Sequence, residues 1–280
     1  MLAQLDHMQL MSEAPERLVN FYQDVMGMHA GQIDHDLWLC QGPQRRLLVA
    51  RGASRTLGFG AYRFASTAGL SALRTRLLER GIPLAPSPSP LFSQEAFSFS
   101  DPDGNRLVFG LPRRQAQQSS ATLAAAPLIA RLQHLVVASE DAESLLHFYS
   151  DIVGLAISDK MLDAGALSAC WLRTSGDREH HSFAIFRAEK KGIDHHSYEV
   201  DDWVRIRDWA DHLADKGFQL SWGPGRHGPG NNLFIFVLDP DGNRIELSAE
   251  LETIYEGRPI GTWRHEPATL NRWGHSFMRS

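Results

Sequence analysis

The sequence predicts an α+β fold made of two similar domains in tandem, each a mixed sheet with flanking helices. The first observation is a repeat, because LDHMQLMSEAPERLVNFYQDVMGM at residues 5–28 returns as LQHLVVASEDAESLLHFYSDIVGL at residues 132–155. The second is the turn DPDGNR, which occurs from Asp101 and again from Asp239. A long unit present twice in one chain predicts two copies of one structure.

Each copy starts with a strand and a helix. LDHMQLM alternates as a half-buried strand does, and an amphipathic helix with an acidic start follows it. Short strands come next, then a second helix at roughly 67–80 in the first copy and roughly 203–216 in the second. The last part is a hairpin through DPDGN, where proline fixes φ and glycine tolerates positive φ.

The chain divides between the copies. We place an N-terminal domain at residues 1–113, a small, polar linker at 114–129 and a C-terminal domain at 130–280. The residues after about Leu251 have little periodicity, so we expect an irregular extension packed on the second domain.

Composition restricts the class of partner. With 280 residues and 43% hydrophobic side chains, the chain is long enough for two cores. A net charge of -5 without a basic stripe argues against nucleic-acid and membrane partners, and no apolar run is long enough to span a bilayer. Cys40 and Cys170 have no metal-site or disulfide-framework spacing. The N-terminus also lacks a leader pattern, so we expect a cytoplasmic protein that binds small molecules or other subunits.

Three residues of the second copy fall at equivalent positions of three predicted strands: His134, His195 and Glu246. A carboxylate such as Glu246 in the middle of a strand is most often a solvated residue. Two imidazoles and one carboxylate on one face, however, form the facial triad that leaves positions open on a divalent metal.

The first copy provides an internal control. Aligning the repeats places Phe59 opposite His195 and Val108 opposite Glu246, and only His7 matches its counterpart, His134. One ligand does not hold a metal, so His7 is expected to be a packed histidine. The polar set therefore indicates function in the second copy rather than a requirement of the fold.

The paired units with LDPDGNRIEL resemble the vicinal oxygen chelate superfamily over nearly the whole chain, up to about Glu250, and the second copy resembles the type I extradiol ring-cleaving dioxygenases. The resemblance implies paired βαβββ modules in curved, partly open, barrel-like sheets. It also implies iron(II), with manganese(II) as the alternative ion, held by His134, His195 and Glu246. Of the adjacent pair, the family pattern selects His195, and His196 is expected to face away.

Further positions follow from the same resemblance. In REHHSFAIF the matching active-site histidine is His181, which is expected to act as general acid and base, and RHG places His227 beside the substrate. Where the family has a tyrosine, ten residues before the metal-binding glutamate, this chain has Phe236.

The resemblance implies an enzyme that cleaves the ring of a catechol with O₂, and a homo-oligomer. We expect Trp171, Phe183, Phe234 and Phe236, with the C-terminal tail as a further contributor, to form the substrate pocket, which favours a hydrophobic or bicyclic catechol. Two alternatives stay open. One is a metal-dependent isomerase or epimerase of the glyoxalase type, which usually needs a second carboxylate, and the other is a ligand-binding protein of the same fold that needs no metal.

Overall fold

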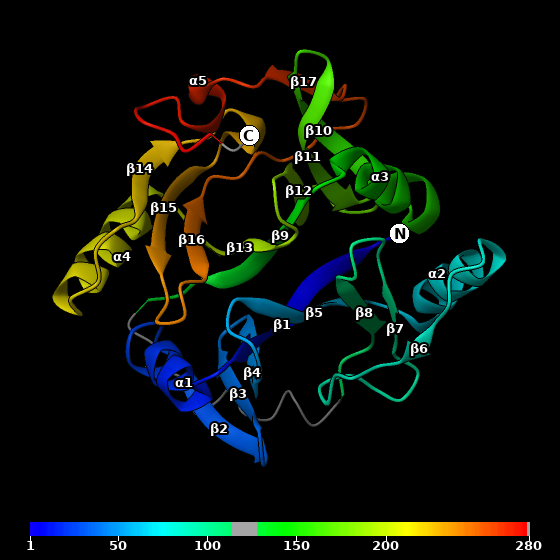
Figure 1. Ribbon diagram of the computed structural model, residues 1–280, viewed down its shortest axis with the longest axis horizontal. Helices are drawn as coiled ribbons and strands as arrows, with labels where there is room; N and C mark the ends of the chain where they lie inside the picture. Colours follow the sequence, from blue (N-terminus) through cyan, green and yellow to red (C-terminus); the bar gives the residue numbers. More distant parts are fainter. Residues whose placement is uncertain (114–127, 279–280) are drawn as a thin grey trace.

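The protein, described here by a computed structural model of residues 1–113 and 128–278, forms two mixed sheets. Figure 1 shows the first half of the chain, blue to teal, below the second half, green to red. The α+β fold with two similar halves is confirmed, while residues 114–127 of the predicted linker lie outside the described residues.

The first sheet has eight strands in the order β2-β3-β4-β1-β5-β8-β7-β6. The central strand β1 pairs in parallel with β4 and antiparallel with β5, which joins two strand-helix-strand modules. Helix α2 begins at the predicted residue because the Ser66 hydroxyl accepts a hydrogen bond from the Gly69 amide. The elements are β1 (Ala3–Ser12), α1 (Pro15–Asp24), β2 (His29–Asp34), β3 (Leu37–Gly42), β4 (Arg45–Arg51), β5 (Thr56–Phe64), α2 (Thr67–Glu79), β6 (Ala85–Pro86), β7 (Phe97–Ser100) and β8 (Arg106–Gly110).

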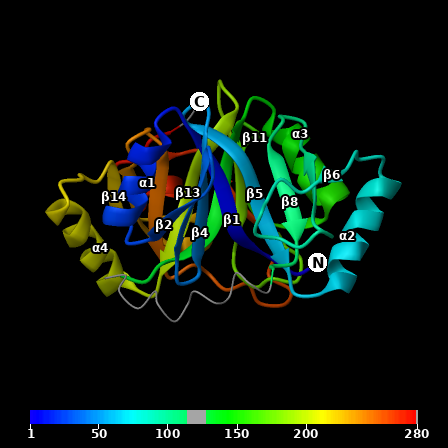
Figure 2. The same cartoon turned by 90° about the horizontal axis from the view of Figure 1, so that it is seen from below.

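The second sheet has nine strands in the order β14-β15-β16-β13-β9-β12-β11-β10-β17. Helix α4 is capped by Asp202, whose carboxylate accepts from the Arg205 amide. Figure 2 shows α4 and α2 at opposite ends of the molecule. The elements are β9 (Arg131–Ser139), α3 (Ala142–His147), the π-helix η2 (Phe148–Val153), β10 (Leu155–Asp163), β11 (Ala166–Thr174), β12 (Phe183–Arg187), β13 (Gly192–Val200), α4 (Trp203–Asp215), β14 (Trp222–Arg226), the 3₁₀ turn η3 (Pro229–Asn231), β15 (Leu233–Leu238), β16 (Arg244–Ala249), β17 (Gly261–Arg264) and α5 (Pro267–Leu270).

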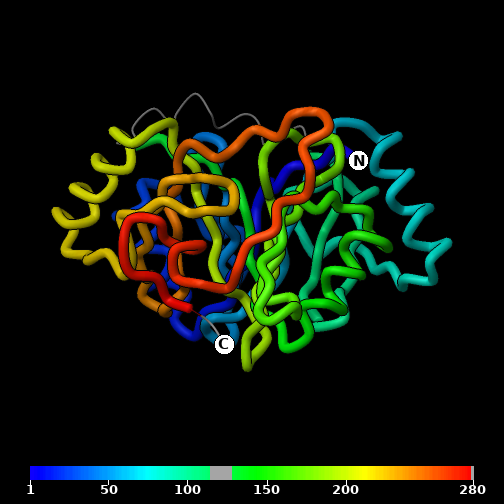
Figure 3. The backbone as a smooth tube through the Cα atoms, turned by 90° about the horizontal axis from the view of Figure 1, so that it is seen from above, coloured from blue at the N-terminus to red at the C-terminus, as the bar shows by residue number. Residues whose placement is uncertain are grey.

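The C-terminal extension is more regular than predicted. Its strand β17 pairs in parallel with β10 and forms the edge of the second sheet. The red C-terminal segment then lies against the second half (Figure 3), where the indole of Trp222 donates to the carbonyl of His275. None of the helices in the described part of the chain is long and apolar enough to cross a membrane.

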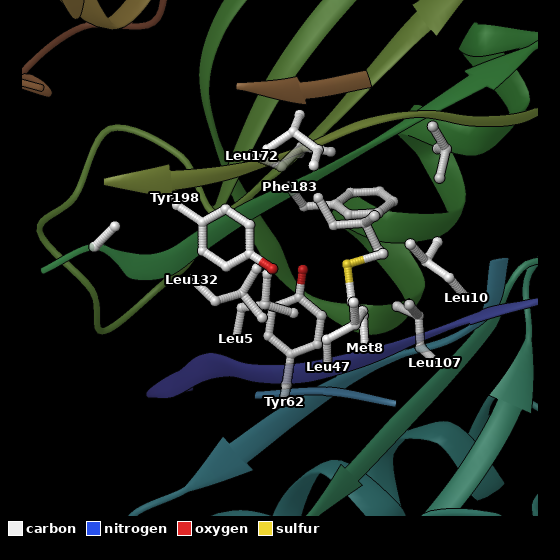
Figure 4. Packing of buried hydrophobic residues seen from close by; sticks show 14 of the residues in the cluster. Leu5, Met8, Leu10, Leu47, Tyr62, Leu107, Leu132, Leu172, Phe183 and Tyr198 are labelled. Carbon is white, nitrogen blue, oxygen red and sulfur yellow. The ribbon is translucent and has the colours of Figure 1, made fainter. Parts of the chain in front are cut away.

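A shared apolar core joins the two sheets. Figure 4 shows Leu5, Met8 and Tyr62 of the first half beside Leu172 and Phe183 of the second, all within one buried cluster. The Tyr62 hydroxyl also donates to the carbonyl of Ser182 across this core. Because one face of each sheet is used here, the other face of the second sheet is left to form a separate cavity.

Candidate metal centre

The three predicted metal ligands come together on three adjacent strands. Ser197 of β13 pairs with His134 of β9 on one side and with Glu246 of β16 on the other, so the three strands place their side chains on one face. Nε2 of His134 lies 2.9 Å from Oε2 of Glu246 and 3.3 Å from Nε2 of His195. His195 Nε2 lies 3.4 Å from the same carboxylate oxygen. All three residues are buried.

Two β-bulges fix the orientation of the imidazoles. The pairing of β9 with β13 shifts its register between Ile193 and His195 and again at the residue before His134. Each extra residue turns its side chain toward the histidine that follows it. Nδ1 of His195 consequently lies 2.5 Å from Oδ1 of Asp194, and Nδ1 of His134 lies 2.5 Å from Oε1 of Gln133.

This arrangement fits a metal ion. An acceptor at each Nδ1 fixes the ring proton there, so both Nε2 atoms present lone pairs. Two lone pairs and a carboxylate that face one another in a buried site repel unless a cation lies between them. Donors at right angles about 2.1 Å from one ion are about 3 Å apart, close to the observed separations.

Burial and the carboxylate control the charge of the ligands. Burial lowers the pKa of both His134 and His195, and Glu246 opposes that effect. Burial alone would raise the pKa of Glu246, whereas the histidines around it, when they carry a proton toward the carboxylate, hold that pKa well below its usual range. At neutral pH the site is therefore two neutral imidazoles and one carboxylate, the protonation states that a divalent cation requires.

His227 and Asn232 lie beside the glutamate. The Asn232 amide donates to Oε1 of Glu246 over 3.1 Å, and Nε2 of His227 is 3.5 Å from that oxygen. Nδ1 of His227 donates to the carbonyl of Leu270 over 2.5 Å, which fixes its proton away from the carboxylate. The turn η3 carries this segment into the site.

His181 lies on the other side of His134, with 4.5 Å between the ring centroids. Its Nδ1 is 2.9 Å from Nδ1 of His180, and its ring lines the cavity. Burial, followed by the neighbouring His134 and His180, lowers the pKa of His181 well below its usual range. His181 is therefore a neutral imidazole at the edge of the three-ligand cluster.

Aromatic side chains form much of the lining of the cavity in front of the ligands. The predicted walls Trp171 and Phe236 line it, but two other expectations need correction. Phe183 packs in the core between the two sheets (Figure 4), and Phe234 lies behind His227, with 3.9 Å between the ring centroids. The sequence did not indicate the walls Phe186, Trp222 and Arg244, whereas Leu270 and Phe277 belong to the C-terminal tail, which it did indicate as a contributor.

The corresponding face of the first sheet is filled with side chains. Phe59 and Val108, which replace His195 and Glu246, are buried with Phe92 in a small apolar cluster. The ring of His7 lies beside this cluster and is hydrogen-bonded to two neighbouring side chains, with Nδ1 2.6 Å from Asp6 and Nε2 2.6 Å from the hydroxyl of Ser89. The first half therefore keeps the fold without the ligand set.

His196 lies on the other face of β13, as its position beside His195 predicts. Its Nε2 is 3.2 Å from the hydroxyl of Tyr22 in the first half of the chain. Burial lowers the pKa of His196 to about 3, so it is a neutral packing residue between the two sheets.

Two histidines and one carboxylate on one face of a sheet are the ligand set of a divalent-metal site. Here that set lies in a fold built from paired βαβββ units. The model of the Glyoxalase/Bleomycin resistance protein/Dioxygenase superfamily matches residues 4–109 and again 131–247. The chain belongs to this superfamily, which confirms the resemblance.

Several relatives have dioxygenase names. The chain is 29% identical to metapyrocatechase 2 of Cupriavidus necator over 223 residues, covering 73% of this chain and 68% of the relative. It is 27% identical to biphenyl-2,3-diol 1,2-dioxygenase of Paraburkholderia xenovorans over 271 residues, covering 90% of this chain and 87% of the relative.

Solved structures share the fold. Homoprotocatechuate 2,3-dioxygenase of Brevibacterium fuscum superposes with a TM-score of 0.82 at 21% identity, covering 98% of this chain and 89% of that one. A Mn(II)-bound glyoxalase of Novosphingobium aromaticivorans gives 0.81 at 23% identity, covering 98% and 92%. At these identities the likeness concerns the fold alone.

Proposed function

We propose that the protein is an iron(II)-dependent extradiol dioxygenase that cleaves the ring of a catechol with O₂. The observation that carries the proposal is the buried cluster of His134, His195 and Glu246 at the floor of an aromatic cavity that also contains His181 and His227. The relatives named as metapyrocatechase and biphenyl-diol dioxygenase support the same reaction class.

The three ligands would hold the ion through two Nε2 atoms and one carboxylate. Bound iron(II) would supply positive charge that lowers the pKa of catechol hydroxyls, and one-electron chemistry for O₂. Nε2 of His227 is a hydrogen-bond acceptor, since the proton is held on Nδ1 by Leu270, and it can receive a substrate hydroxyl. His181 is the candidate general base and acid, because its neutral ring lines the cavity.

The walls favour an apolar substituent on the catechol. The rings of Trp222 and Phe236 stack at 5.2 Å and face a cavity also lined by Phe186 and Leu270. The guanidinium of Arg244 lies 4.9 Å over the ring of Phe236 and 3.5 Å from Asp194, so its charge is already engaged. We therefore propose a hydrophobic or bicyclic catechol, and the predicted homo-oligomer stays a prediction.

The isomerase alternative lacks its usual second carboxylate at the matched positions. Glu246 is the one carboxylate in the three-residue cluster, and Val108 occupies its counterpart in the first half. A metal-free binding protein would leave the converging lone pairs of His134 and His195 without a cation.

The proposal is tested on anaerobically purified protein by metal analysis and by oxygen uptake with a panel of alkyl-, aryl- and carboxyl-substituted catechols. We expect one iron per chain and ring-opened product, recognised by its absorbance, with the aryl and alkyl substrates preferred. Full activity of metal-free protein in a chelator would contradict the proposal, as would isomerisation of a thiohemiacetal without oxygen uptake.

Asp194→Ala is expected to weaken iron(II) binding by about 10- to 100-fold, because it removes the acceptor that fixes the proton of His195 on Nδ1. Competition against a chelator of known affinity measures the effect. Asp163→Ala is the matched control, since this exposed carboxylate pairs with Arg187 away from the site. Equal affinities in the two variants would show that the carboxylate of Asp194 has no part in metal binding.

Phe236→Tyr is expected to shift substrate preference toward polar catechols with a modest change in kcat. The ring packs edge-on against His195 at 5.2 Å, so a phenol here would bring a hydrogen-bond donor to the cavity. The ratio of kcat/KM for a carboxylated and an alkyl catechol measures the shift. A rise in kcat of about a thousandfold, the scale of a lost oxyanion donor, would mean that the native enzyme lacks an essential donor.

A further inference from the structure

Three buried side chains lead from β10, the strand next to the edge of the second sheet, to the cavity. Oδ2 of Asp159 on β10 is 3.1 Å from Nε2 of His180, and Nδ1 of His180 is 2.9 Å from Nδ1 of His181. Asp159 and His180 are fully buried, and neither one lines the cavity or belongs to the three-ligand cluster. A buried carboxylate and a buried imidazole, both outside the site, therefore form a chain of contacts that reaches His181, the residue proposed as the acid and base of the site.

Asp159 is held as an ionised carboxylate. Its oxygens accept from the guanidinium of Arg258 at 2.8 Å, the indole of Trp263 at 2.6 Å and the amide of Gly261 at 3.1 Å. Burial by itself would raise the pKa of Asp159, but the contacts with His180, Arg258 and Trp263 lower it to about 2. This carboxylate places a negative charge 3.1 Å from Nε2 of His180, which favours a proton on that nitrogen rather than on Nδ1.

The backbone of Gly230 approaches the ring of His180 closely. The turn η3 packs against it, and a Cβ added at Gly230 would lie 3.1 Å from Nδ1 of His180. Gly230 also has a φ of 72°, which side chains rarely adopt. In this packing the two ring nitrogens of His180 face Asp159 and His181.

The proton positions follow in order from the carboxylate. In the singly protonated form of His180 the nitrogen that faces the Asp159 carboxylate is Nε2, so the one N–H lies there and Nδ1 is an acceptor. At 2.9 Å the two Nδ1 atoms share one proton, and this proton must then come from His181. His181 is left with a proton on Nδ1 and a lone pair on Nε2.

We propose that Asp159 and His180 are positioning residues that hold His181 in its Nδ1-protonated tautomer, with Nε2 free as the base toward the cavity. The use of that base rests on the proposed dioxygenase function, whereas the tautomer is a property of the folded chain. The residues that fix Asp159 come from the C-terminal extension, so the segment around β17 acts on the site through this chain of contacts.

Nitrogen NMR of metal-free protein with ¹⁵N-labelled histidine reads the tautomer without any turnover. The signals of His181 are identified by their loss in His181→Gln. We expect Nδ1 to be protonated and Nε2 to be bare in the wild-type chain. The reverse pattern would overturn the proposal, because it would mean that a doubly protonated His180 donates to His181.

Two substitutions of His180 separate positioning from packing. His180→Asn keeps an acceptor oxygen near the place of Nδ1, whereas His180→Leu has none. In His180→Leu we expect His181 to shift toward the Nε2-protonated form and kcat to fall by about 10- to 100-fold with little change in KM. His180→Asn should restore the tautomer and most of kcat.

An unchanged tautomer in folded His180→Leu, or equal losses of kcat in both variants, would overturn the inference. If His180→Leu does not fold, Asp159→Asn provides the second variant, because its amide can donate to His180 and reverse the order of protons. If the tautomers behave as expected but no catechol is cleaved, the positioning holds and the proposed function fails.

Discussion

Glu246→Ala should abolish iron binding and ring cleavage together. The substitution removes the one carboxylate of the cluster and leaves two neutral imidazoles, so nothing in the three-residue set offsets the charge of a buried divalent ion. Metal analysis after anaerobic purification and oxygen uptake with a catechol measure the two losses. Glu246→Gln keeps the side-chain volume and should show the same losses without a cavity.

A pair of equivalent histidines provides the control. His134→Ala removes a ligand and should lose iron, while His7→Ala alters the same strand position of the first half, where Phe59 and Phe92 occupy the site, and should keep it. Thermal unfolding of each variant separates loss of metal from loss of the fold. Full iron occupancy in Glu246→Ala, or iron loss in His196→Ala but not His195→Ala, would show that the ligand set is wrong.

The ligand set could be located from the sequence because the repeat fixes the register of the strands. The DPDGNR turn places Glu246 on β16, and the aligned repeats place His134 and His195 on the neighbouring strands. In a sheet the side-chain period is two, so one anchor in each strand determines which residues share a face.

The same period hides the residues that support the site. Alternation places Asp194 and Gln133 on the face opposite the histidines that follow them, and a β-bulge in each strand brings them back. A bulge depends on pairing with a neighbouring strand, which a single strand sequence does not display. The same applies to β17, whose short GTWR segment is a strand only because β10 offers it an edge.

The misplacement of Phe183 has a related cause. Counting by twos from His181 puts Phe183 in the cavity, but β12 begins only at Phe183, and the residues before it do not follow the strand alternation. Within the strand, Ala184 and Phe186 face the cavity side and Phe183 and Ile185 face the shared core. A shift of one residue reverses every side chain of a strand.

His181→Gln should remove nearly all turnover while substrate binding survives. Glutamine keeps a polar side chain of similar length but has no nitrogen that accepts and returns a proton near neutral pH, and a positioned acid–base group contributes about 10²- to 10⁴-fold to a rate. The hydrogen bond from Nδ1 of His227 to the carbonyl of Leu270 remains, and the three metal ligands are untouched, so catechol binding should stay within about tenfold of wild type.

Oxygen uptake gives kcat for this variant, and an anaerobic titration that follows the absorbance of the bound catechol gives its affinity. His147→Gln is the matched control, because this histidine is exposed on α3 and pairs with the surface carboxylate of Asp151. A near wild-type kcat in His181→Gln would assign the proton transfer to another group, with His227 the next candidate, since its Nε2 lies 3.5 Å from Glu246. Loss of catechol binding in parallel with kcat would instead make His181 a substrate-binding residue, because a group that acts only in the chemical step changes kcat without changing the affinity of the ground state.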